Sequence, residues 1–175
     1  MTKGVLMTSW IDSVLNRIRK RKLSTAEQTL DSYEKGVAAV GNGKTAEAIR
    51  HFTEAITVVP NSSKLYHHRA DAFALNGQHL EAITDYDVAV RIDPAYPDTY
   101  LDRGNSRYAI GHLDDAVKDF SEAIRLKSDW AEAYANRAVA HAELKNQDES
   151  QQDESKAISL GVDEARLEEM LADTR

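Results

Sequence analysis

The side chains with the greatest capacity for chemistry are six histidines set among an excess of carboxylates. His67 and Asp71 stand four positions apart, so a helix would place them on one face, a spacing that suits metal binding or proton transfer. A metal site needs further ligands, and nothing nearby has a recognisable ligand spacing. The chain has no cysteine, no phosphate-binding glycine loop and no nucleophile motif. We therefore predict no catalytic residue, no metal and no cofactor, and interpret these histidines as solvated side chains of a binding surface.

A repeat of 34 residues defines the elements that must position these side chains. In each copy an alanine precedes an aromatic residue by four positions, and a second alanine follows three positions later. The copies are Ala48, Phe52 and Ala55; Ala82, Tyr86 and Ala89; and Ala116, Phe120 and Ala123. Glycine and a basic residue recur at the same interval, in the columns Gly43, Gly77 and Gly111, and Lys35, Arg69, Arg103 and Arg137. A fixed period in this range is typical of stacked helical pairs.

Turn residues and helix breakers divide the chain into four predicted helix pairs. The pairs are 29–42 with 46–59, 63–76 with 79–92, 97–110 with 113–126, and 131–144 with 147–160. Residues 23–28 read as a hinge, although Ser24 or Thr25 could cap the next helix. The last second helix is almost entirely polar, as expected of a terminal repeat whose outer side faces water. Asp163 can cap a final helix that covers the open end.

These residues carry a family resemblance: the chain resembles the tetratricopeptide repeat (TPR) family, whose unit is also 34 residues long. The resemblance covers about residues 29–162, with repeats at 29–62, 63–96, 97–130 and 131–162. It implies an all-α, right-handed superhelix (an α-solenoid) of about four helix hairpins whose first helices line a concave groove. An N-terminal basic amphipathic helix and hinge (1–28) and a C-terminal capping helix (163–175) would flank this TPR domain. Such folds serve protein–protein interaction, and they do not by themselves identify the ligand.

The groove implied by the resemblance is acidic. Its candidate partner-binding residues are Tyr33, Glu34, His67, His68, Asp71, Asp98, Asp102, Asn105, Tyr108, Glu132 and Asn136. With Glu143 and Lys64, which share these columns, six carboxylates face one lysine. A concave acidic surface attracts basic segments, while the tyrosines and asparagines offer stacking surface and hydrogen bonds. The alternative is that these acids only solvate an acidic protein.

One subtype of the family grips the C-terminal carboxylate of a chaperone tail with Lys and Asn side chains, followed by Lys and Arg. Beginning at the first repeat, the corresponding positions here are Tyr33, Val37, His68, Asp98 and Asp102. A carboxylate ligand needs cations at such positions, and acids repel it. We therefore predict that this chain does not bind chaperone tails.

Charge is unevenly distributed along the chain. The total is −7, but residues 1–27 hold six cations against two acids, a balance of +4, so the remainder carries −11. The acidic body argues against nucleic acid as a partner. The basic amphipathic segment 9–22 could dock on its own repeats, lie on an anionic membrane, or bind a partner or second copy. No secretory signal or membrane span is recognisable, which favours the cytoplasm, with peripheral membrane contact through 9–22 as an alternative.

The sequence thus predicts a non-catalytic scaffold or adaptor that holds a protein or peptide partner, basic in character, in the concave groove. The alternative is a peripheral membrane-assembly or client-chaperone factor, such as a small type III secretion chaperone, that uses segment 9–22 for docking. Self-association remains open, because the basic head of one copy could enter the acidic groove of another.

Overall fold

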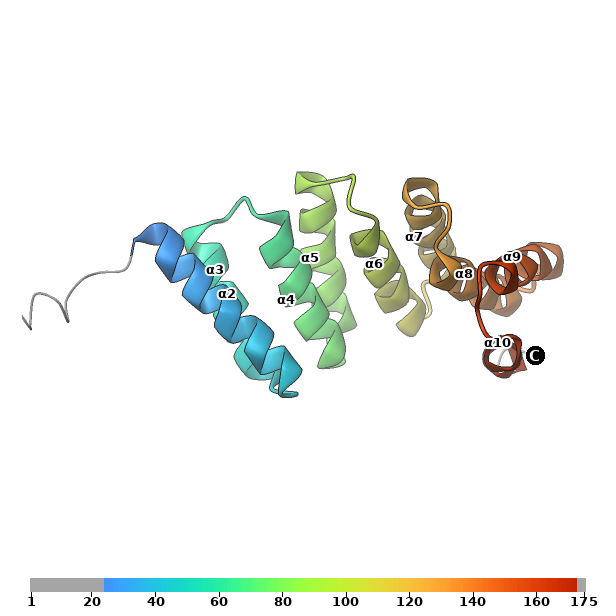
Figure 1. Cartoon of the computed structure of the whole chain (residues 1–175), viewed down its shortest axis with the longest axis horizontal. Coiled ribbons are helices and arrows are strands. Elements are labelled where there is room, and N and C mark those ends of the chain that lie inside the picture. The colour runs from blue at the N-terminus through green and yellow to red at the C-terminus, as the bar shows by residue number, and fades with distance from the viewer. Residues whose placement is uncertain (1–23, 173–175) are drawn as a thin grey trace, which may run out of the picture.

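The computed structural model describes residues 24–172, and all regular structure within that range is α-helical. The helices are α2 (Thr25–Gly41), α3 (Thr45–Val58), α4 (Ser63–Leu75), α5 (His79–Ile92), α6 (Pro97–Ala109), α7 (Leu113–Leu126), α8 (Ala131–Glu143), α9 (Gln147–Ser159) and α10 (Glu164–Ala172). Consecutive helices pair as hairpins, and the hairpins stack side by side along the molecule (Figure 1). The predicted all-α superhelix is confirmed.

The repeated alanine and aromatic columns form the core of each hairpin. Phe52, Tyr86 and Phe120 are almost completely buried, and the flanking alanines have essentially no exposed surface. Small side chains let paired helices approach closely, and the aromatic ring fills the remaining space. The core is therefore a strip along the stack, and the helix faces that point away from this strip are available for partners.

Helix boundaries follow the predicted limits except at the first helix. α3 to α9 begin and end within one residue of their predicted limits. α2 instead begins at Thr25, so the predicted hinge at 23–28 is wrong from residue 25 onward. The reason is a capping box: Ser24 Oγ accepts from the Glu27 amide at 3.2 Å, and Glu27 Oε2 accepts from the Ser24 amide at 2.7 Å. Ser24 is thus the N-cap of this helix, as the alternative given above for residues 23–28 allowed.

A glycine faces each buried phenylalanine of the repeat. Gly36 lies against Phe52 and Gly104 against Phe120, so closely that an added Cβ would come within 2.6 Å of a ring carbon. In the second repeat, alanine stands at the same position, Ala70, and the facing ring is Tyr86. Gly104 therefore allows the close approach seen in this hairpin, and a side chain there would displace the Phe120 ring.

Gly104→Ala is expected to lower the free energy of unfolding by about 1–3 kcal/mol, because the new methyl group overpacks the contact with Phe120. Gly41→Ala is the matched control, since no atom lies within 4 Å of an added Cβ at that helix end. Urea denaturation of both variants measures the difference. Equal stability of Gly104→Ala and the wild type would contradict this account of the packing.

A ladder of buried ion pairs runs through the second, third and fourth hairpins. In each, an arginine of the first helix donates from Nε and Nη2 to both oxygens of an aspartate in the second helix, at 2.6–3.0 Å. The pairs are Arg69 with Asp85, Arg103 with Asp119, and Arg137 with Asp153. Bidentate pairing of this kind fixes geometry as well as adding energy. We call these three pairs the Arg–Asp ladder.

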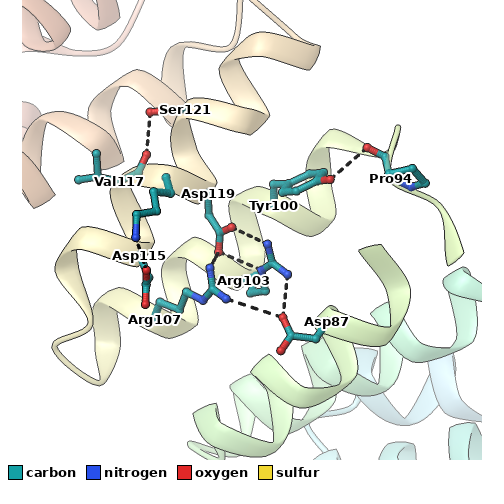
Figure 2. A network of polar contacts seen from close by, with 10 residues as sticks. Asp87, Pro94, Tyr100, Arg103, Arg107, Asp115, Val117, Asp119 and Ser121 are labelled. Atoms are coloured by element: carbon teal, nitrogen blue, oxygen red, sulfur yellow. Dashed lines mark hydrogen bonds and ion pairs between the residues drawn. The ribbon is translucent and has the colours of Figure 1, made fainter. Parts of the chain in front are cut away.

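The third nitrogen of each ladder arginine joins neighbouring hairpins. Nη1 donates to a side chain of the preceding second helix: Thr53 at 3.1 Å, Asp87 at 2.7 Å and Ser121 at 2.9 Å, respectively. Figure 2 shows Arg103 between Asp87 and Asp119, with Arg107 directed at the same two carboxylates. The ladder therefore connects the two helices within the second, third and fourth hairpins, and it also connects each of these hairpins to the one before it.

The C-terminal end of the stack is covered by α10. Leu167 and Leu171 are buried against Ala135 and Val139 of α8. Asp163 Oδ1 accepts from the Arg166 amide at 2.8 Å, as a helix N-cap does. Because α10 contacts α8, it also forms one wall of the surface made by the first helices.

Candidate functional site

The first helices of successive hairpins lie next to one another, with contacts between α2 and α4, α4 and α6, and α6 and α8. Cavities open along this face. One of about 410 Å³ is lined by Asp71, Asp102 and Asn105. A smaller one of about 120 Å³ is lined by Asn105 and Asn136, and a third of about 410 Å³ by Asn136 and Glu132. Neighbouring cavities share the lining residues Asn105 and Asn136, and we call the three together the acidic groove.

Carboxylates converge on Asp102 near the middle of the acidic groove. Its side chain is 35% exposed, and its pKa is raised from 3.8 to about 7. Burial is the main cause, followed by the charges of Asp71, Asp98 and Glu132. Like charges raise the pKa of a carboxyl only when they lie close enough to disfavour its ionised form. Four carboxylates from three first helices therefore create one negative surface.

The raised pKa predicts a pH dependence of stability. Asp102 binds a proton more tightly in the folded chain than in the unfolded chain, so its contribution to the free energy of unfolding falls as pH rises from about 4 to about 7. Asp102→Asn removes that contribution and is expected to exceed the wild type in stability at pH of about 8. Well below pH 4 the two should be nearly equal, because Asp102 is then protonated in both the folded and the unfolded state. Urea denaturation across this range measures the effect, and a less stable variant at the higher pH would contradict it.

His67 does not match its predicted environment. We interpreted it as a solvated groove residue, but it is 6% exposed, so that interpretation is wrong. Its Nδ1 lies 3.1 Å from Thr99 Oγ1, and its ring lies against those of Tyr86 and Tyr96. Burial lowers the pKa of His67, which favours the neutral ring. Burial of the ring results from packing of α4 against α6 and the loop before it, a contact that residue spacing does not reveal.

The N-terminal end of the same face is less polar. Tyr33 is half-buried, its hydroxyl lies 3.2 Å from Nε2 of His68, and the Lys64 ammonium lies 4.6 Å from its ring centroid. Leu30 and Leu65 join Tyr33 and Lys64 around a cavity of about 490 Å³. The predicted stacking surface of Tyr33 is thus partly covered by Lys64. Glu34 is exposed on α2 and lines none of the three cavities of the acidic groove.

Polar side chains pair across neighbouring first helices at the C-terminal end. Asn136 Nδ2 donates to Asn105 Oδ1 at 2.8 Å, so one hydrogen bond of each amide is already used. The Tyr108 hydroxyl donates to Glu143. The structure therefore brings together His67, His68, Asp71 and Asp102, and separately Asn105 with Asn136. It leaves Glu34 apart from both groups.

The predicted amphipathic segment 9–22 lies outside the described residues. Among the helices of residues 24–172, none is both long enough and apolar enough to cross a bilayer.

Two family models match the chain, one described as Tetratricopeptide repeat over residues 33–97 and one described as TPR repeat over residues 104–145. Together they span more than half of the 175 residues. No curated protein matches it.

Solved structures share the fold. The crystal structure of MamA is 19% identical, with a TM-score of 0.74 over 85% of this chain and 83% of that chain. The first TPR of Spaghetti (RPAP3), bound to the HSP90 peptide SRMEEVD, is 28% identical, with a TM-score of 0.66 over 67% of this chain and 94% of that chain. The Arabidopsis OM64 TPR domain is 27% identical, with a TM-score of 0.65 over 67% and 97% of the two chains. With its 34-residue period, its stacked hairpins and these matches, the chain belongs to the tetratricopeptide repeat family.

Proposed function

We propose that this protein is an adaptor that holds a basic peptide segment of a partner protein in the acidic groove. The observation that carries the proposal is the convergence of Asp71 of α4, Asp98 of α6 and Glu132 of α8 on Asp102, whose pKa all three charges raise. Bringing like charges together is unfavourable for the free protein, and cationic side chains of a ligand would relieve it.

The similar structures support a peptide as the class of ligand. The first TPR of Spaghetti (RPAP3) is bound to the peptide SRMEEVD, whose C-terminal end is acidic. In this chain Asp98 and Asp102 stand where carboxylate-binding members of the family carry cations. The same fold with the opposite charge in its groove favours a ligand of the opposite charge.

Two kinds of contact would hold such a peptide. Carboxylates of Asp98, Asp102 and Glu132 would accept hydrogen bonds from Lys or Arg side chains. The amides of Asn105 and Asn136, which line the groove between these acids, would bond the peptide backbone through the groups not used in their mutual contact. Side-chain charge would then select the ligand, while the amides would accept many sequences.

Fluorescence anisotropy with labelled peptides tests the proposal on the full chain, in a buffer that contains a metal chelator. A peptide rich in Lys and Arg is expected to bind, and its affinity should fall as salt is raised, because salt screens partly exposed charges. A peptide of the same length rich in Asp and Glu, and the peptide SRMEEVD, should not bind. Equal binding of basic and acidic peptides, or affinity that salt does not change, would refute the proposal.

A further inference from the structure

We propose that His67, His68, Asp71 and Asp102 bind one divalent transition-metal ion of the Zn²⁺ class. Three of these residues belong to α4, and Asp102 reaches them from α6. Donor atoms of His67, His68 and Asp71 all lie within 4.8 Å of one another, and among residues 24–172 this is the one group of three or more histidine and acidic side chains so placed. This goes beyond peptide binding and does not depend on it, because the ion would be held by the chain's own side chains.

The distances from the two histidines to the carboxylates that they face are close to those between neighbouring ligands of a tetrahedral ion. His68 Nδ1 lies 3.3 Å from Asp71 Oδ2, and His67 Nε2 lies 3.5 Å from the same oxygen and 3.7 Å from Asp102 Oδ2. Zinc bonds of about 2.0–2.1 Å at tetrahedral angles separate neighbouring ligand atoms by about 3.3–3.4 Å. Small shifts would therefore place one ion between His67 Nε2, His68 Nδ1 and Asp71 Oδ2, and the Asp102 carboxylate, which approaches His67, would have to move toward the other two ligands to complete the site.

The atoms of these ligands that do not face the shared space have partners of their own. His67 Nδ1 lies 3.1 Å from Thr99 Oγ1, and His68 Nε2 lies 3.2 Å from the Tyr33 hydroxyl. Both hydroxyls can accept a hydrogen bond from a ring N–H, so they can hold the tautomers that leave His67 Nε2 and His68 Nδ1 free for a metal once the ion has replaced their contacts with the carboxylates.

The carboxylate of Asp71 is oriented in the same way. The Tyr86 hydroxyl donates to its Oδ1 at 2.8 Å, which leaves Oδ2 directed at both histidines. Hydrogen bonds that orient the ligands of a metal are a regular feature of built metal sites. Three of the four proposed ligands have such a partner in this structure, which distinguishes the group from a chance meeting of surface acids.

Burial of the His67 side chain also favours a metal ion over a water molecule in the space that this side chain shares with the two carboxylates. The His67 side chain is 8% exposed, yet its Nε2 faces two carboxylates at distances longer than a good hydrogen bond. A divalent cation would satisfy this nitrogen and neutralise the crowded carboxylates together. Two imidazole nitrogens with two carboxylate oxygens select Zn²⁺, Co²⁺ or Ni²⁺ rather than Mg²⁺ or Ca²⁺, which prefer oxygen ligands alone.

The test is a zinc titration of the full chain, prepared without a polyhistidine tag, stripped by a chelator and studied without peptide. Competition with a coloured zinc indicator is expected to show one bound equivalent. His68→Gln and Asp102→Asn should each weaken binding by at least about tenfold, and Tyr33→Phe, which removes only an orienting hydroxyl, by about tenfold. His112→Gln is the control, since His112 is exposed at the start of α7 and makes no side-chain cap there.

Asp102→Asn keeps the experiment interpretable, because the variant loses a repulsive charge and is expected to stay folded, which circular dichroism checks. Zinc affinity unchanged in Asp102→Asn and His68→Gln would overturn the proposal, as would the absence of a stoichiometric site. An equal loss in His112→Gln would also overturn it, because binding would then be distributed over surface histidines. Peptide binding measured with chelator present is a separate result, so either proposal can fail alone.

Discussion

Asp119→Ala is expected to lower the free energy of unfolding by about 3–5 kcal/mol, the effect of removing one partner from a buried ion pair. The Asp119 side chain is 4% exposed and accepts hydrogen bonds from both Arg103 and Arg107. Those guanidiniums are themselves mostly buried, so truncation would leave two cations sharing Asp87, the carboxylate that lies within ion-pair distance of both. The loss of stability comes more from the buried arginine charges left without the Asp119 carboxylate than from the lost hydrogen bonds.

The matched control lies on the same helix. Asp115 also pairs with a cation, Lys118, at 2.8 Å, but its side chain is 49% exposed. Asp115→Ala is expected to change the free energy of unfolding by no more than about 1 kcal/mol, as for other surface pairs. Urea denaturation monitored by circular dichroism compares the variants. Equal effects at the two positions would mean that the Arg–Asp ladder contributes no more than a surface pair.

Neutralising the groove is expected to have the largest effect on binding. The triple variant Asp98→Asn, Asp102→Asn and Glu132→Gln should weaken binding of a Lys- and Arg-rich peptide by about 10–100-fold. This range corresponds to about 0.5–1 kcal/mol for each charge that pairs with the ligand at a partly exposed site. Amide replacements retain side-chain size, so the change isolates charge from shape.

A control with the same change in net charge separates the groove from general attraction. Asp114→Asn, Asp148→Asn and Glu149→Gln remove three exposed acids from the second helices α7 and α9. Anisotropy titrations of the two triple variants are compared in low salt. If both lose affinity equally, the peptide responds to the charge of the whole protein and the acidic groove is not its site.

The fold could be predicted from the sequence because the repeat places the same residue types at equivalent positions of several helix pairs. Ala116, Phe120 and Ala123 are as completely buried as their equivalents one period earlier, so local pattern and tertiary packing coincide. The first helix was the exception, since the capping box of Ser24 and Glu27 lies outside the repeated columns.

The candidate site was only partly predictable. The groove columns placed Asp71, Asp102 and Asn105 on one face, but His67 was assigned to solvent because spacing along one helix says nothing about burial by the next. The approach of Asp102 to His67 joins two hairpins, and it depends on how the stack twists.

The Arg–Asp ladder is indicated in the sequence by a constant separation between arginine and aspartate, in addition to the arginine column itself. The arginine column was recognised, whereas its partners were not. Each aspartate follows its arginine by 16 residues, in all three hairpins that contain the ladder. The first repeat has Lys35 and His51 at the equivalent positions, and there Lys35 pairs with Asp31 of its own helix. A search for polar pairs at constant separation would have found the ladder.

The most direct test of the central claim is to locate the bound peptide by NMR, with an isotope-labelled chain titrated by the Lys- and Arg-rich peptide. The account predicts chemical-shift changes on α4, α6 and α8, centred on Asp102 and including the side-chain amides of Asn105 and Asn136. Shift changes confined to the second helices α3, α5, α7 and α9 would contradict it and place the binding surface on the other side of the stack.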